Sequence, residues 1–247
     1  WQHKTFEFLT DKKDENFLNE VFKEIKDSDF HLESITKEVK TQHPPKPFSQ
    51  PELQETANKR FRFSLDKTLE ISQSLYEKKL MTYPRTDSPY LPGADKENYY
   101  RLISKLSKPE DLKAFNNKEP SCIKNCNSPH TAIIPTFEAA GPIKLTEDES
   151  KIMNLIIDRF ITAFKKPLIY NEILLTITNG KHCFRCIEKR VVDSGYTNKD
   201  VYLGKFNYNY LKKIKEKIMD LNILEIENVK PKHFTPGTLL KAMINVY

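Results

Sequence analysis

The sequence has no uninterrupted apolar run that approaches the roughly 20 residues of a transmembrane helix. It also lacks internal repeats and low-complexity tracts, and no charged-then-apolar leader follows Trp1. We therefore expect a soluble protein with no membrane partner. The 247 residues suffice for one large domain or two modest ones. Because the chain begins without Met and stops inside a helical pattern, a piece of a longer polypeptide is expected.

A strong excess of one charge is also missing. The chain has 40 basic and 34 acidic side chains, for a formal charge of +6. A bias this small permits a polyanionic partner such as a nucleic acid without requiring one. Composition therefore leaves the function open, and the motifs must decide it.

Cysteine is scarce, with only four residues in a chain too large to need disulfides for its core. Reduced thiols are the expected state of all four. Cys183 and Cys186 have the spacing of half a zinc site, which Cys122, Cys126 or His182 could complete. However, the same residues alternate like a strand, and no glycine follows as in a zinc knuckle. A zinc-stabilised interaction module therefore remains the less favoured alternative.

Two stretches of the chain have the periodicity of a β-rich domain. Residues 12–28 place apolar side chains on one stripe at helical spacing, which predicts an amphipathic helix covering a sheet. Asn179-Gly180 is typical of a hairpin turn, because both residues tolerate positive φ. The expected strands are Leu32–Val39, Ile173–Thr178, His182–Lys189, Val201–Leu203 and Ile223–Val229.

A helical region begins after residues 43–51, which are rich in proline. Proline has no N–H donor and forces its predecessor into extended geometry, so this segment is a domain boundary. A capping box at Ser49 and a cap at Ser64 predict two short helices joined by a tight Arg62-Phe63 turn. This unit resembles a helix-turn-helix, but it is also a common structural corner.

Two more helices are expected downstream, over Ala94–Leu106 and after a second capping box at Thr146. The predicted fold class is α+β and multi-domain, a β-rich domain interrupted by a mainly helical domain. The β-rich domain takes residues 1–43 and 168–231, and the helical domain takes residues 44–167. Residues 232–247 would begin a further element that this chain truncates.

The segment around Tyr83 carries the chemistry. Tyr83 precedes Pro84, so its backbone is biased to extended geometry, and Arg85 two residues later points to the same side. A guanidinium beside a phenol suits a phosphate held next to a nucleophile. A phenol has a pKa of about 10, so nearby positive charge must favour the phenolate. Alternatively, Tyr83 and Arg85 are ordinary surface residues, with Asp87 pairing Arg85.

This segment belongs to a longer pattern. Thr82-Tyr-Pro-Arg-Thr-Asp-Ser88, followed by Tyr90-Leu-Pro92, resembles the active-site signature of type IA DNA topoisomerases, and Pro84 resembles the topoisomerase III branch. Family motifs are also resembled, in the expected order, by the two helices before this signature, by Ser128-Pro-His-Thr-Ala-Ile-Ile-Pro-Thr136 and by Phe234-Thr-Pro-Gly-Thr-Leu-Leu-Lys-Ala-Met243. The resemblance implies that the β-rich domain is an arch and that residues 232–247 begin a DNA-binding domain.

The resemblance implies roles for single residues. Tyr83 would be the nucleophile that bonds to a 5′ phosphate, Arg85 the cation that positions the phosphate, and His130 a residue that contacts DNA or handles a proton. Four more would support the loop or contact DNA: Lys79, Thr82, Thr86 and Asp87. Resealing the strand would need no nucleotide cofactor, because the covalent intermediate stores the energy of the broken bond.

The resemblance also implies what the chain does not contain. Mg²⁺ would be bound by an acid-rich catalytic domain before this region, and no carboxylate pair with metal-ligand spacing is found here, so the chain by itself should not relax DNA. The expected partners are single-stranded DNA and the remaining domains of the same polypeptide, in a monomer. Phe206–Tyr210 with the lysines after it either binds single strands or is a strand leading into a solvated helix. A non-catalytic helix-turn-helix DNA-binding protein is the rival function.

Overall fold

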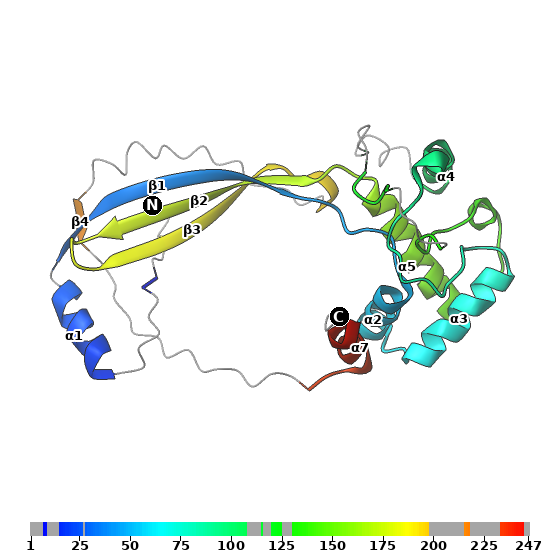
Figure 1. The fold of residues 1–247 in the computed structure, drawn as a ribbon, viewed down its shortest axis with the longest axis horizontal. Coiled ribbons are helices and arrows are strands. Elements are labelled where there is room, and N and C mark those ends of the chain that lie inside the picture. Colours follow the sequence, from blue (N-terminus) through cyan, green and yellow to red (C-terminus); the bar gives the residue numbers. More distant parts are fainter. Residues whose placement is uncertain are drawn as a thin grey trace. The chain divides into compact units, whose positions relative to one another are not determined.

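A computed structural model describes residues 7–8, 15–26, 28–107, 115, 120–124, 130–197, 215–217 and 233–244. The chain separates into two compact units. One comprises Trp1–Gln42 and Leu168–Lys230, the other His43–Pro167 and Pro231–Tyr247 (Figure 1). Helices and an antiparallel sheet confirm the α+β class. The division into functional domains, with an arch and a third domain from residue 232, stays a prediction.

The first unit is built on a sheet with strand order β3-β2-β1-β4 (Figure 1). Strand β1 spans Asp29–Gln42 and pairs antiparallel with β2, Leu168–Thr178, although 125 residues separate them in the sequence. Strand β3, Cys183–Asp193, pairs with β2 as a hairpin. These strands confirm three of the predicted ones: β1 is longer than predicted at both ends, β2 at its start and β3 at its end.

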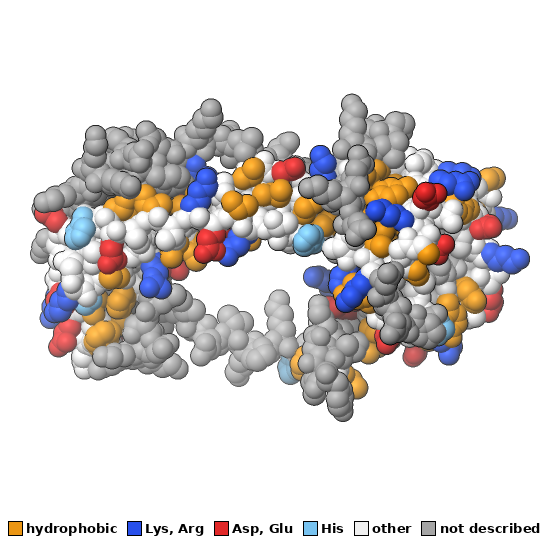
Figure 2. All heavy atoms as spheres, turned by 45° about the horizontal axis from the view of Figure 1, so that its top comes forward, with side chains coloured by type: hydrophobic (Ala, Val, Ile, Leu, Met, Phe, Trp, Pro, Cys, Tyr) orange, Lys and Arg blue, Asp and Glu red, His pale blue; other side chains and the backbone are white. Residues whose placement is uncertain are grey.

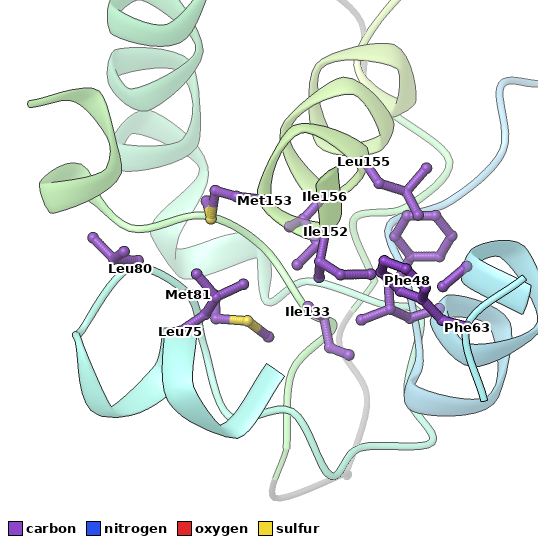
Figure 3. Close-up of a cluster of buried hydrophobic side chains, with 12 residues drawn as sticks. Phe48, Phe63, Leu75, Leu80, Met81, Ile133, Ile152, Met153, Leu155 and Ile156 are labelled. Carbon is purple, nitrogen blue, oxygen red and sulfur yellow. The ribbon is translucent and has the colours of Figure 1, made fainter. Parts of the chain in front are cut away.

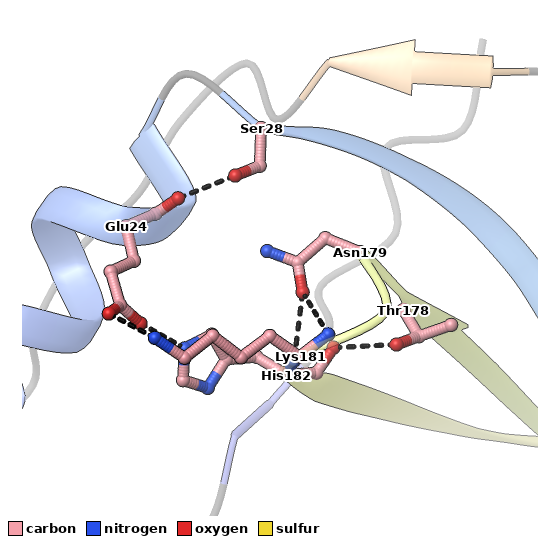
Figure 4. Close-up of polar contacts among 6 residues, drawn as sticks. All are labelled: Glu24, Ser28, Thr178, Asn179, Lys181 and His182. Atoms are coloured by element: carbon pink, nitrogen blue, oxygen red, sulfur yellow. Dashed lines mark hydrogen bonds and ion pairs between the residues drawn. The ribbon is translucent and has the colours of Figure 1, made fainter.

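Helix α1, Glu15–Lys26, lies against the hairpin end of this sheet, as its apolar stripe predicts. Its buried residues Val21 and Ile25 pack with Phe30 of β1 and Phe184 of β3. Figure 4 shows Glu24 of α1 reaching the turn, where its carboxylate bonds Lys181 and, at 2.7 Å, the Nε2 atom of His182. These contacts lower the pKa of Glu24, the bond from Lys181 most.

The β2–β3 turn differs from the expected two-residue form. Four residues, Asn179 to His182, separate the last paired residues, and of the two at the start only Gly180 has a positive φ, at 90°. The Asn179 side chain closes the turn instead: its Oδ1 accepts from the backbone N–H groups of Lys181 and His182 at 3.0 and 2.8 Å (Figure 4). An Asx-type turn thus replaces the second positive φ.

The second unit is mainly helical. Its helices are α2 (Gln50–Phe61), α3 (Leu65–Glu77), α4 (Lys96–Leu106), α5 (Glu147–Ala163) and α7 (Pro236–Ile244), with 3₁₀ turns at Gly93–Asp95 and Phe137–Ala140. Arg62 ends α2 in the left-handed region with φ 60°. The tight corner between α2 and α3 is therefore present as expected.

Two of the three predicted N-caps are confirmed. Thr146 accepts from the backbone of Glu149 while the Glu149 side chain accepts from the backbone of Thr146, a complete capping box for α5. Ser64 Oγ accepts from Lys67 N at 3.1 Å and caps α3. The capping box at Ser49 is wrong, because its side chain makes no cap hydrogen bond. Ser49 is instead a buried residue, 6% exposed.

One core of the helical unit joins α2, α3 and α5 to extended chain segments. Figure 3 shows Phe48 and Ile133, from segments without helix, pointing among the side chains of α3 and α5. Leu75, Met81, Ile152 and Ile156 are also buried there. A second cluster gathers α4 against the end of α5 around Phe160 and Phe164. The chain segments before and after Tyr83 are thus held in place by these two hydrophobic clusters.

Helix α7 packs on α2 within the same unit. Gly237 is buried, and a Cβ added to it would meet the Cα of Glu55 at 3.1 Å and the Asn58 side chain at 3.4 Å. Any larger residue would push the two helix backbones apart. The glycine in the terminal motif therefore allows close helix contact.

Some predicted elements lie outside the described residues: the strands at 201–203 and 223–229, the aromatic segment 206–210, and Cys126. The alternative in which the lysines after Tyr210 lie on a solvated helix is wrong at Lys215–Lys217, which pair with β1 as strand β4. Among the described residues no helix has the length and hydropathy of a membrane span. On the face drawn in Figure 2, basic and acidic side chains are interspersed.

Candidate active site around Tyr83

The segment that follows α3 alternates strictly between solvent and interior. Pro84, Thr86 and Ser88 are buried, whereas Tyr83, Arg85 and Asp87 are exposed. Such alternation is the property of an extended chain with one face packed on a core. Tyr83 and Arg85 therefore lie on one solvent-facing side, as their spacing predicts. The Tyr83 side chain is 39% exposed.

Thr82 fixes the start of this segment to the His130 motif. Its backbone N–H donates to the Ile134 carbonyl at 3.0 Å, and its hydroxyl accepts from the Ile134 N–H at 2.9 Å. The same hydroxyl donates to the Ala132 carbonyl at 2.9 Å. The backbone and hydroxyl of Thr82 together thus make the bonds that two paired strands would otherwise make. These bonds fix the direction of the residues on either side of Thr82. The role of Thr82 is to support the backbone.

Thr86 supports the other end of the loop. Its side chain is 3% exposed, its hydroxyl accepts from Ser88 N at 3.1 Å, and its carbonyl accepts from Gln50 N at 2.7 Å at the start of α2. Buried polar groups of this kind are costly unless paired, so the bonds hold one backbone conformation. A direct contact between Thr86 and DNA is not what this geometry favours.

Two aromatic rings flank Tyr83. The centroid of His130 lies 5.2 Å from that of Tyr83 with the rings tilted by 36°, and Tyr76, at the end of α3, lies 5.6 Å away, edge to face. Both separations fall within the range of favourable ring pairs. Residues 47 positions apart in the sequence, Tyr83 and His130, therefore meet at the surface. The ring contacts orient the phenol and leave part of it accessible.

Lys79 adopts a left-handed conformation, with φ 61°, directly after α3. The Thr136 hydroxyl donates to its carbonyl at 2.6 Å and holds this turn. Lys79 also lines an open pocket of about 430 Å³ beside Tyr76, with Glu77, Met81, Thr136 and Glu138. The pKa of Glu138 is lowered, first by its own backbone N–H and then by Thr136 and the charge of Lys79.

A buried carboxylate behind the site ties α3 to α5. Glu149 accepts from Lys78 Nζ at 2.6 Å, Ser74 Oγ at 2.7 Å and Thr146 N at 2.9 Å. These bonds, that from Lys78 foremost, lower the pKa of Glu149 to about 2. The sequence identified Glu149 only as a cap. Its link to Lys78, next to Lys79, needed the tertiary fold, since 71 residues separate the two.

The structure thus brings some of the predicted site residues close to Tyr83 and leaves others apart. Thr82, Tyr83 and His130 meet in one cluster. Arg85 shares the exposed side of Tyr83, and among the described residues Asp87 forms no ion pair with it. Sequence reasoning missed Tyr76 as a neighbour of the phenol, although its position near the end of a helix that leads into the motif was a usable signal.

The described residues contain no group of three or more His, Cys, Asp or Glu side chains that could hold a metal ion. Cys122 is buried, which raises its thiol pKa to about 11, whereas Cys183 is exposed on β3. Zinc is therefore unsupported by the part of the chain that can be described.

The structure thus places the exposed Tyr83 beside His130, on a loop held by hydrogen bonds of Thr82 and Thr86. The family described as DNA topoisomerase matches residues 1–246, and the chain belongs to this family. The resemblance of its motifs is thereby confirmed. A non-catalytic helix-turn-helix protein gains no support from the match, although the corner between α2 and α3 is real.

Similar proteins include the DNA topoisomerase 3 of Staphylococcus haemolyticus, 32% identical over 98% of this chain and 36% of the relative. The DNA topoisomerase 1 of Pyrococcus horikoshii is 31% identical over 89% of the chain and 33% of that protein. Among solved structures, full-length topoisomerase I from Thermotoga maritima matches 98% of this chain and 42% of its own, with TM-score 0.63 and 26% identity. The chain spans about a third of the length of these curated relatives.

Proposed function

We propose that this chain is the part of a type IA topoisomerase that supplies the nucleophile for cleaving and rejoining single-stranded DNA. The observation that carries the proposal is the half-exposed Tyr83 on a hydrogen-bonded loop, with the His130 ring 5.2 Å away and Arg85 on the same exposed side. A tyrosine in a hydrophobic core could not serve, and this one is not in a core.

In the proposed reaction, the Tyr83 phenolic oxygen attacks phosphorus and forms a phosphotyrosine with the 5′ phosphate. The bond from phosphorus to the 3′ oxygen breaks, and the leaving oxygen takes a proton to become a 3′ hydroxyl. The 3′ hydroxyl later attacks the same phosphorus, which releases Tyr83 and restores the strand. One phosphoester replaces another at each step, so no nucleotide cofactor is consumed.

His130 and Arg85 have separate parts in this scheme. An imidazole beside the phenol can accept its proton or pass one to the leaving oxygen, the commonest role of histidine in catalysis. Arg85 would hold the phosphate oxygens in two parallel hydrogen bonds and stabilise the charge of the crowded transition state. Lys79 and Asp87, both exposed on the same loop, would contact the DNA on either side.

The whole-enzyme activity that follows is a change of DNA topology by passing a strand through the transient break, in relaxation or decatenation, by a monomer in the bacterial cytosol. Mg²⁺ would be held by a catalytic domain that precedes this region in the family. When bound there, the ion supplies charge for the phosphoryl groups. The topoisomerase III branch is favoured by Pro84 and by the names of several relatives.

The test is a covalent adduct. A polypeptide that joins this chain to the preceding catalytic domain is mixed with a labelled single-stranded oligonucleotide, and the phosphotyrosyl product is resolved on a denaturing gel. Tyr83→Phe should abolish the adduct. Tyr76→Phe, which removes a hydroxyl from the neighbouring ring, should keep it.

Two outcomes would overturn the assignment. One is strand cleavage that persists in Tyr83→Phe. The other is an adduct that mass spectrometry maps to a different tyrosine. A His130→Gln variant then separates proton handling from ring packing: it should slow adduct formation and flatten its pH profile while DNA affinity is kept.

A further inference from the structure

A second cluster of charged and aromatic side chains lies on the helical unit, centred on Tyr90. Lys46 Nζ donates to the Tyr90 hydroxyl at 2.6 Å and lies 4.1 Å from the ring centroid. Lys124 Nζ lies 5.3 Å from the same centroid. The three residues come from separate segments of the chain, so only the fold brings them together. We call them the Tyr90 cation cluster.

Among the described residues, no carboxylate balances the positive charge of this cluster: no Asp or Glu oxygen there lies within 4.0 Å of the ammonium groups of Lys46 or Lys124. Other lysines of the unit do have partners: Lys67 pairs with Asp148, and Lys78 with Glu149. The two cluster nitrogens are within about 10 Å of each other, one Debye length at 0.1 M salt, so they repel and together attract an anion.

Arg159 of α5 holds the Lys46 backbone in place. Its guanidinium stacks on the Phe48 ring at 4.1 Å and donates from Nη1 to the Lys46 carbonyl at 3.3 Å. Burial lowers the pKa of Arg159, an effect opposed by the charges of Glu52 and Glu55. A half-buried cation thus holds the Lys46 carbonyl, and Glu52 and Glu55 offset part of its charge. It acts as a positioning residue.

The same backbone segment carries the cluster and the Tyr83 loop. The Tyr90 carbonyl accepts from Ala132 N at 3.0 Å, and the Ala132 carbonyl accepts from the Thr82 hydroxyl at 2.9 Å. Seven residues of extended chain separate Tyr83 from Tyr90, at most about 25 Å. A single strand of DNA that passes Tyr83 can therefore reach the cluster within a few nucleotides.

We propose that the Tyr90 cation cluster binds a phosphodiester of the single-stranded DNA several nucleotides away from the bond that Tyr83 attacks. Lys46 and Lys124 would each donate to phosphate oxygens, and the Tyr90 ring, which both cations approach, would offer a face to a neighbouring base. The inference rests on the proposed function for its position along the strand. Its affinity for DNA does not depend on cleavage.

Binding of a fluorescein-labelled oligothymidylate to the 247-residue chain tests the proposal by anisotropy over a series of salt concentrations. Lys46→Gln and Lys124→Gln should each weaken binding by about 3- to 10-fold at low salt, and each should reduce the slope of log K against log salt by about 0.7. Lys144→Gln removes the same charge from an exposed position of the same unit and should change affinity less than twofold.

Melting temperatures guard against a folding artefact. If Lys46→Gln unfolds because its bond to Tyr90 is lost, the exposed Lys124→Gln decides the matter. Unchanged affinity and salt slope in Lys124→Gln, losses equal to those of Lys144→Gln, or no binding by the unaltered chain would each overturn the proposal.

The adduct assay distinguishes this failure from a failure of the proposed function. If a Tyr83 adduct forms but the lysine variants bind DNA normally, only the proposal for the Tyr90 cation cluster is refuted. If the lysine variants bind DNA more weakly but no Tyr83-dependent adduct forms, the nucleophile assignment is refuted and the proposal for the cluster stands.

Discussion

Thr82 and Ile134 are joined by two hydrogen bonds, from the Thr82 N–H to the Ile134 carbonyl at 3.0 Å and from the Ile134 N–H to the Thr82 hydroxyl at 2.9 Å. A side chain therefore completes a pairing that backbone alone would make in a sheet. The pairing ends one residue before Tyr83. It connects the two motifs that the sequence keeps about 50 residues apart.

Thr82→Val keeps the shape of the side chain and removes its hydroxyl. The Ile134 N–H, in a residue only 6% exposed, then loses its partner, which should cost about 1–3 kcal/mol of unfolding free energy. Urea unfolding followed by circular dichroism measures the loss. Thr82→Ser retains the hydroxyl and should lose clearly less. Equal losses in both variants would show that the methyl group, rather than the hydrogen bonds, stabilises the loop.

Glu149 should make stability depend on acid pH. Its pKa is about 2 in the folded chain against an ordinary glutamate value of 4.5, so the folded state favours the ionised form. The stabilisation is complete above about pH 4.5 and is lost as the pH falls towards 2.

Glu149→Gln should destabilise the chain by about 2 kcal/mol at neutral pH, because Lys78 and Ser74 lose a charged acceptor. The difference from the unaltered chain should shrink between pH 4.5 and 2 in urea titrations. Glu147→Gln removes a carboxylate that is 83% exposed and should have little effect at any pH. A gap between the Glu149→Gln and unaltered curves that stays constant down to pH 2 would contradict this account.

Gly180 is predicted to resist substitution for conformational reasons alone. Its φ is 90°, and a Cβ added to it would meet no atom within 4 Å, so the cost of Gly180→Ala is backbone strain of about 1–2 kcal/mol. Gly141→Ala is the matched control, because its φ is −92°. Thermal unfolding should show a lower melting temperature for Gly180→Ala only. A loss as large in Gly141→Ala would point to another cause.

The sequence by itself determined the local elements. Periodicity and caps located α1, α3, α5 and the β2–β3 hairpin, because apolar spacing and N-terminal acceptors act within a few residues. The capping box predicted at Ser49 failed: this serine is buried and its side chain makes no cap hydrogen bond, and a local pattern does not predict burial. The four-residue turn was missed because Asn179 bonded forward with its side chain.

The active-site signature also came from sequence, since its residues are contiguous and Tyr83, Arg85 and Asp87 share one side by strand geometry. Only the tertiary structure decided that His130 faces Tyr83, that Glu149 joins Lys78, and that Lys46 and Lys124 surround Tyr90. Each of these contacts joins segments at least 34 residues apart, Lys124 and Tyr90 being the nearest. Local patterns carry no information on such distances, because packing of the whole core sets them.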